Sequence, residues 1–132
     1  MILVDSSAWI EFQRATGSAV DERLTKAIET DEPLATPGLV VLEVLAGARD
    51  ERQARDLRRL LDRCSFVPLE EPSDWDLAAG LYRACRRAGT TVRRLPECLI
   101  AALAMRMGAD LLHQDADFDA IAQHAPLAVV GL

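Results

Sequence analysis

The stretch that decides the fold is M-I-L-V-D-S-S at residues 1–7, where three branched apolar residues run directly into an aspartate and two serines. This pattern predicts a buried strand over residues 2–5 and a helix just after it, capped by Ser6 or Ser7. In an open parallel α/β sheet, ligands bind outside the carboxyl ends of the strands. Asp5 is therefore expected at the place where such folds do chemistry.

The rest of the chain repeats this alternation of short apolar segments and helical patterns. Further strands are predicted over residues 34–36, 66–69, 110–113 and 127–130, with helices between them, among others over residues 39–46, 50–63 and 97–107. Strands that alternate with helices predict an α/β fold whose parallel sheet is covered on both faces. The length of 132 residues suits one domain over residues 1–132.

Composition indicates an ordinary globular protein. Half of the residues are hydrophobic, and only 5% are aromatic. The three cysteines, Cys64, Cys85 and Cys98, form no C-x-x-C pair and are expected to be reduced core residues of a cytoplasmic protein. The sequence has no signal-peptide pattern, and its longest uncharged apolar run, residues 98–105, is too short for a membrane span. We therefore expect no membrane association.

Charge is distributed unevenly along the chain. The net charge of −6 by itself argues against nucleic-acid binding. Residues 49–106, however, hold twelve of the fifteen basic side chains and nine acids, a local charge of +3, and the remainder carries −9. The middle of the chain can therefore face an anion while the two ends supply carboxylates.

Three acids stand where surface charge is not expected. Asp5 ends an apolar strand, Glu43 interrupts an otherwise apolar helix, and Glu97 precedes the apolar run C-L-I-A-A. An ionised carboxylate in such surroundings is costly unless it is paired or binds a metal. Arginines could pair with one of the three but are less able to explain all of them.

Two further acids, Asp115 and Asp117, follow the predicted strand at residues 110–113 and repeat the order of strand, acid and helix seen at Asp5. Acids from neighbouring strands and helices can converge on one pocket, where like charges repel and raise each other's pKa. A hard cation with oxygen ligands relieves this repulsion. Two such ions about 3.5–4 Å apart are the usual apparatus for cleaving a phosphodiester.

These segments together resemble the PIN-domain ribonucleases, and within them the VapC toxins of bacterial VapBC toxin–antitoxin pairs. The resemblance rests on D-S-S-A-W-I at residues 5–10, Glu43, E-C-L-I-A-A at residues 97–102 and D-A-D-F at residues 115–118, in the family's order and over essentially the whole chain. It implies a single PIN-like domain, a three-layer α/β/α sandwich with a central parallel sheet of four to five strands.

The resemblance also implies an activity and a site. Asp5 matches the first family acid, Glu43 the second and Glu97 the third, and Asp115 with Asp117 supply the fourth cluster. In the family these acids hold Mg²⁺ or Mn²⁺, one or two ions, and a bound water hydrolyses RNA. Ser7 is expected to support the metal ligands. A cognate VapB-type antitoxin, an RNA substrate and a homodimer are the implied partners.

Two departures from the family pattern define an alternative function. The third acid is normally Asp, and Glu97 is one methylene longer, a shift of the size that can cost much catalysis. Gln114 stands where the family often has Arg before the last acids. The alternative is a PIN-like RNA- or partner-binding module with weak or no catalysis.

A third hypothesis is a phosphatase of the haloacid dehalogenase type, which also begins with a strand that ends in Asp. That family would need a second Asp at position 7, which is Ser, so this hypothesis is not favoured.

Each acid also has a structural interpretation. Asp5 could be a helix N-cap, Glu43 an ion-pair partner, and Glu97 a first-turn acid that stabilises a helix dipole. Asp117 could support the metal ligands rather than bind. A calcium loop of the EF-hand type starting at Asp115 is excluded, because its sixth and twelfth positions hold Ala and Pro instead of Gly and Glu.

The arginines fall into two groups. In the helix at residues 50–63 they stand at i,i+4 spacing from acids, as Glu51–Arg55, Arg52–Asp56 and Arg58–Asp62, which predicts a salt-bridged exposed face. A second group lacks acids nearby in sequence and precedes Glu97, so its members are predicted to contact RNA phosphates. This second group is Arg86, Arg87, Arg93 and Arg94.

Overall fold

The computed structural model describes all residues from 1 to 132. Four strands and seven helices follow one another along the chain. The strands are β1 (Ile2–Val4), β2 (Leu34–Pro37), β3 (Ser65–Val67) and β4 (Asp110–Leu112). The helices are α1 (Ser6–Gln13), α2 (Ala19–Glu29), α3 (Gly38–Ala46), α4 (Glu51–Asp62), α5 (Ser73–Arg87), α6 (Leu95–Met107) and α7 (Ala116–Ala122).

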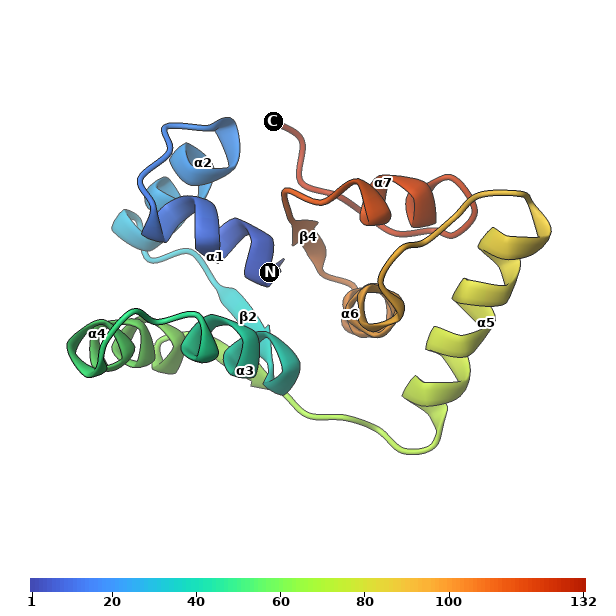
Figure 1. Ribbon diagram of the computed structural model, residues 1–132, viewed down its shortest axis with the longest axis horizontal. Helices are drawn as coiled ribbons and strands as arrows, with labels where there is room; N and C mark the ends of the chain where they lie inside the picture. Colours follow the sequence, from blue (N-terminus) through green and yellow to red (C-terminus); the bar gives the residue numbers. More distant parts are fainter.

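The strands form one parallel sheet in the order β3-β2-β1-β4. In Figure 1 helices α1 to α4 lie on one side of the view and α5 to α7 on the other; β2 lies between α1 and α3, and β4 lies between the two groups of helices. The predicted α/β fold with a covered parallel sheet is thus confirmed. Strand β1 is central and fully buried, as its uninterrupted apolar sequence requires when both faces of a sheet are covered.

The register of the sheet decides which chain segments meet. Val4 of β1 lies opposite Leu112 of β4, and the backbone N–H of Asp5 donates to the Leu112 carbonyl at 3.0 Å. The carboxyl ends of these two strands therefore lie side by side, although 107 positions separate Asp5 from Leu112 in sequence. The segments that follow them, at Asp5 and at Asp115, start from one edge of the sheet.

Two predicted strands differ from the structure. The segment 127–130 forms only an isolated bridge, Val129 to Leu111, and Val129 stays 39% exposed because the chain meets β4 at a single residue. The third strand is Ser65–Val67 rather than 66–69, because Pro68 has no N–H to donate to a ladder. The central sheet consequently has four strands.

Helix α6 is fixed to α5 by a buried ion pair. Arg106 donates to the Asp74 carboxylate from Nε at 2.9 Å and from Nη2 at 3.1 Å, and Asp74 is 1% exposed. The Glu70 backbone N–H completes the set at 2.7 Å. At its end α6 turns into β4 through Gly108, whose positive φ of 62° is readily adopted only by glycine. These contacts hold the helix that carries Glu97.

The exposed face of α4 is only partly paired. Arg58 and Asp62 lie 3.6 Å apart as predicted, whereas Asp56 pairs with Arg59 at 3.1 Å instead of with Arg52. The predicted pair between residues 51 and 55 is absent within 4.0 Å. These side chains are exposed, where an ion pair contributes little free energy, so sequence spacing does not select one pair.

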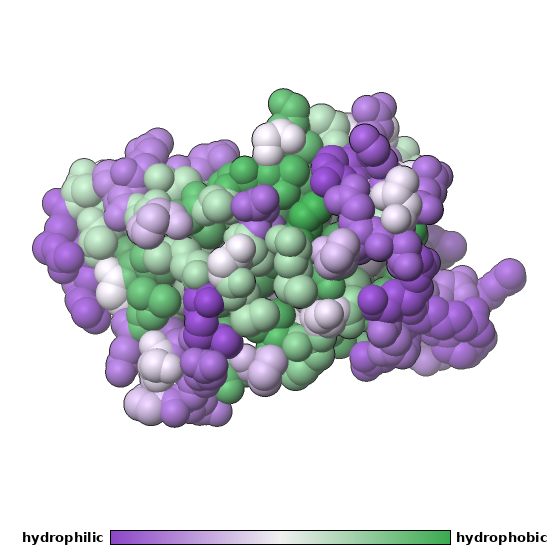
Figure 2. All heavy atoms as spheres, turned by 180° about the vertical axis from the view of Figure 1, so that it is seen from behind, coloured by the Kyte–Doolittle hydropathy of each residue, from purple (hydrophilic) through white to green (hydrophobic).

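Apolar side chains also reach the surface. Figure 2, which views the protein from behind, shows hydrophobic atoms across the middle of that face and hydrophilic atoms toward both ends. A groove of about 460 Å³ is lined almost entirely by apolar residues of α3, α5 and α6, among them Leu39, Trp75 and Leu95. None of the helices has the length and apolar character needed to cross a membrane.

Candidate active site

Asp5 both caps a helix and faces a pocket. As N-cap of α1, its Oδ2 accepts from the Ser7 backbone N–H at 3.0 Å and from Ser7 Oγ at 2.5 Å. Its Oδ1 is buried and has no hydrogen-bond partner. Burial raises the pKa of Asp5, and the Ser7 hydrogen bonds offset part of that rise. Asp5 itself, not Ser6 or Ser7, is the cap, so the structural role uses one oxygen and leaves the other for the pocket.

Ser7 joins the ends of the two central strands. Its hydroxyl donates to Asp5 and accepts from the backbone N–H of Gln114 at 2.9 Å. The hydroxyl therefore fixes the Asp5 carboxylate relative to the segment that follows β4. Support of the metal ligands by Ser7 stays a prediction, and these contacts are the geometry that it requires.

Glu97 is the most perturbed acid of the protein. It lies in the first turn of α6, is 1% exposed, and neither of its carboxylate oxygens has a hydrogen-bond partner. Burial, and then the nearby charge of Asp5, raise its pKa to about 8, although the Arg94 guanidinium acts in the opposite direction. A carboxylate stabilised only by a helix dipole would have a lowered pKa, so the dipole interpretation does not account for Glu97.

Glu43 faces the same pocket from α3 but is already paired. Its Oε1 accepts from Ser6 Oγ at 3.3 Å and its Oε2 from Arg94 Nη2 at 2.9 Å. Its side chain is 22% exposed. Glu43 thus joins the acids at the pocket and also has the arginine partner of its structural interpretation. Sequence reasoning missed Ser6 as a contact to Glu43, and its only signal is its position beside Asp5.

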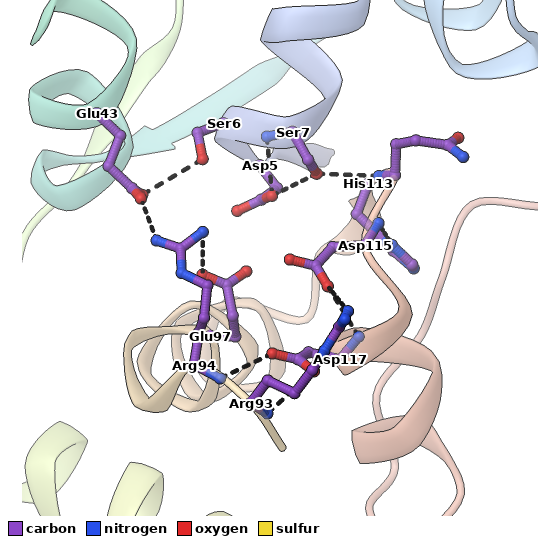
Figure 3. Close-up of polar contacts among 11 residues, drawn as sticks. Asp5, Ser6, Ser7, Glu43, Arg93, Arg94, Glu97, His113, Asp115 and Asp117 are labelled. Atoms are coloured by element: carbon purple, nitrogen blue, oxygen red, sulfur yellow. Dashed lines mark hydrogen bonds and ion pairs between the residues drawn. The ribbon is translucent and has the colours of Figure 1, made fainter. Parts of the chain in front are cut away.

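Asp115 and Asp117 have different surroundings. Asp115 caps α7 through Oδ1, which accepts from the Asp117 backbone N–H at 2.9 Å, and its carboxylate lies across the pocket from Glu97 and Asp5 (Figure 3). Asp117 is 3% exposed, and its two oxygens accept from the backbone N–H groups of Arg93 at 3.1 Å and Arg94 at 2.9 Å. Asp117 therefore ties the loop before α6 to α7, which is a supporting position.

His113 holds the backbone of Asp115 by a hydrogen bond. Its Nδ1 accepts from the Asp115 backbone N–H at 3.1 Å, and its Nε2 lies 3.6 Å from Asp119 Oδ1. The ring also packs against Phe118, with centroids 4.9 Å apart. The sequence marks His113 only as the polar residue that closes an apolar strand.

The four arginines of the second group separate into two pairs. Arg93 Nε lies 3.4 Å from Asp117, and Arg94 binds Glu43, so the expectation that these two lack acidic partners is wrong. The loop fold brings together acids that are distant in sequence, which local spacing cannot show. Arg86 and Arg87 are exposed at the end of α5 and have no acid within 4.0 Å, and Arg86 lies over the Tyr82 ring. Their contact with RNA stays a prediction.

The pocket has the chemistry of a hard-cation site. Three buried carboxylate oxygens, one of Asp5 and two of Glu97, have no hydrogen-bond partner, and the acids that face the pocket offer only oxygen atoms as ligands (Figure 3). Such a set suits Mg²⁺ or Mn²⁺. In the arrangement described, no three acids are close enough together to hold one ion, and Glu43 is turned to Arg94. The residues thus fit a hard cation chemically.

Comparison with known proteins bears on the family of this chain. Residues 2–123 match the PIN domain family. The ribonuclease VapC11 of Mycobacterium tuberculosis and the VapC ribonuclease Mb1587 of Mycobacterium bovis are each 44% identical over 124 residues, which cover 93% of this chain and 92% of theirs. The structure of VapBC2 from Rickettsia felis bound to a promoter DNA fragment superposes over 100% of this chain with a TM-score of 0.76, at 15% identity. This chain belongs to the PIN-domain family, and within it to the VapC ribonucleases.

Proposed function

We propose that this protein is a metal-dependent endoribonuclease toxin, one PIN-like domain over residues 1–132, whose Asp5, Glu97 and Asp115 hold one or two Mg²⁺ or Mn²⁺ ions. RNA cleavage by a VapC ribonuclease restrained by a VapB antitoxin follows from the family. The observation that carries the metal assignment is the burial of Asp5 and Glu97 beside each other with three unpartnered oxygens. Glu43 is the fourth acid of the set and becomes available when its arginine partner leaves.

The chain's own residues orient and protect this set. Ser7 holds Asp5 through Oδ2, which keeps Oδ1 directed into the pocket. His113 holds the backbone of Asp115, and Asp117 holds the loop that starts α6. Without a cation, Glu97 keeps a proton on its carboxylate near neutral pH, because its pKa is about 8. A bound cation supplies an activated water and neutralises charge that develops on the phosphate.

Two surfaces of the protein are suited to binding other proteins. An acidic pocket is complementary to an arginine of an antitoxin arm, which would compete with both cation and RNA. We propose a homodimer that uses the apolar surface of α3, α5 and α6. Because the substrate is RNA, the proposed place of action is the cytoplasm.

The proposal is tested by RNA cleavage in vitro. Purified protein is incubated with structured RNA in Mg²⁺, in Mn²⁺ and in EDTA, beside Asp5→Asn and Glu97→Asp variants. The proposal expects cleavage with either cation, none in EDTA, and loss of at least about a hundredfold in Asp5→Asn, as for other groups that place a catalytic charge. Cleavage by Asp5→Asn at the wild-type rate would refute the site.

A second function, a binding module with weak catalysis, is favoured by two observations. The third acid is Glu97 instead of Asp, and Glu43 is held by Arg94 rather than left free. The same assay separates the two functions. A wild-type protein that binds RNA without cutting it, beside a Glu97→Asp variant that cuts, would establish the binding module.

A further inference from the structure

The Arg94 guanidinium occupies the side of the pocket between two of the acids. Its Nη2 donates to Glu43 Oε2 at 2.9 Å, and its Nη1 lies 3.9 Å from Glu97 Oε1 (Figure 3). No other basic side chain lies within 4.0 Å of Asp5, Glu43 or Glu97. Arg94 is therefore the internal positive charge that compensates these carboxylates.

The arginine and a divalent cation would use the same oxygens. Glu43 has one oxygen engaged by Ser6 and the other by Arg94, so it offers no unhindered oxygen to an ion. Glu97 is 1% exposed, lacks any hydrogen bond and points into the pocket, so its ionised form requires a positive partner at close range. The ion pair between the Arg94 guanidinium and Glu97 is weak, because the two groups are 3.9 Å apart and share no hydrogen bond.

The arginine is also placed so that its side chain can leave. Its side chain is 54% exposed, whereas that of Glu97 is 1% exposed, so the guanidinium reaches the pocket from the solvent side. Its backbone N–H is held by Asp117 Oδ2 at 2.9 Å. The side chain can consequently rotate outward while the start of α6, and Glu97 with it, stays in place.

We propose that Arg94 is a displaceable internal counter-ion: it holds Glu43 and approaches Glu97 in the cation-free protein and gives way when a divalent cation binds. This inference rests on the proposed metal-dependent function and adds a residue that sets the affinity for the cation. The exchange replaces one positive partner of the carboxylates by another. It also explains how acids that are not close enough together to hold an ion in the cation-free arrangement become a cation site.

The test measures Mn²⁺ binding directly, by the loss of the free-ion electron paramagnetic resonance signal, in the absence of RNA. Arg94→Gln is expected to bind Mn²⁺ about three- to tenfold more tightly than wild type, the size expected for removing one partly exposed charge-assisted pair. Arg94→Lys keeps the charge but loses the two donor groups of the guanidinium. Its Mn²⁺ affinity is expected to lie between those of wild type and Arg94→Gln. Circular dichroism and melting curves check that each variant is folded.

Arg87→Gln is the matched control. It removes an equal charge from the exposed end of α5, where no acid lies within 4.0 Å, and it should shift the affinity by less than about twofold in salt that screens exposed charges. A double-mutant cycle with Glu43→Gln adds a second readout. The gain from Arg94→Gln should shrink in that background, because the pair to be broken is already absent.

Three results would overturn the inference. An unchanged or weaker Mn²⁺ affinity in Arg94→Gln means that Arg94 orders the acids for the ion instead of competing with it. Equal tightening in Arg87→Gln means that only the net charge of the protein matters. If wild type, Arg94→Gln and Arg94→Lys all bind no Mn²⁺, the proposed metal dependence fails together with the counter-ion. The first two results leave that metal dependence intact, since wild type still binds the ion.

Discussion

The protonation of Glu97 predicts how stability depends on pH in the cation-free protein. The folded protein keeps the Glu97 proton up to a pKa of about 8, whereas the unfolded chain releases it near the ordinary value of 4.5. Between these pH values the folded state binds more protons, so the free energy of unfolding falls as pH rises. The contribution of Glu97 is fully present below pH 4.5 and is lost by pH 8.

The magnitude follows from the same pKa values. One pKa unit corresponds to about 1.4 kcal/mol, so the rise from 4.5 to about 8 sets an upper limit of about 5 kcal/mol. The measured loss should be smaller, several kcal/mol, because side-chain rearrangement and water entry stabilise the charged form in the folded state. For a domain with about 5–15 kcal/mol of total stability, such a loss is readily measured.

Glu97→Gln removes the titration while it keeps the side chain's shape. In EDTA, urea unfolding followed by far-UV circular dichroism should show wild type losing stability from pH 5 to pH 8.5 and Glu97→Gln losing much less. The two proteins should be close at pH 5, and Glu97→Gln should be the more stable at pH 8.5. Glu29→Gln, a change of an exposed glutamate at the end of α2, is the control and should follow wild type at every pH.

One result would refute this reasoning. If the stability difference between wild type and Glu97→Gln is the same at pH 5 and at pH 8.5, Glu97 is ionised in the folded protein throughout. Arg94 and water would then stabilise the ionised form of Glu97, and burial beside Asp5 would not raise its pKa.

Three further predictions concern the cation, the support of Asp5 and the α5–α6 contact. Because the cation competes with protons for the acids, Mn²⁺ should raise the melting temperature more at pH 8.5 than at pH 5.5, and an equal rise would contradict this. Ser7→Ala should lower the RNA cleavage rate about 10- to 100-fold with little loss of stability, because supporting hydrogen bonds orient metal ligands. Arg106→Met should cost about 3–5 kcal/mol in urea unfolding by leaving Asp74 charged and buried, and adding Asp74→Asn should recover part of that cost.

Local sequence patterns predicted much of the fold and most of the acids at the pocket. The apolar run before Asp5 predicts a strand with both faces covered, because a central parallel strand buries its side chains on both faces of the sheet. Glu43 and Glu97 stood out because each charge lies among apolar neighbours in its own helix, and the structure brings both to one pocket. Such signals lie within one helical turn or one strand, where chain neighbours are also neighbours in space.

The pairing of charges was decided only in three dimensions. Arg94 and Glu43 lie 51 positions apart, and they meet because α3 and the start of α6 approach the same end of the sheet. Asp117 resembled a ligand in sequence, but its oxygens are engaged by backbone N–H groups 23 and 24 residues away. The sequence thus determined which residues can carry negative charge into the core, and the tertiary structure decided which of them keep a free oxygen, because long-range hydrogen bonds and ion pairs depend on distances that spacing along a chain does not encode.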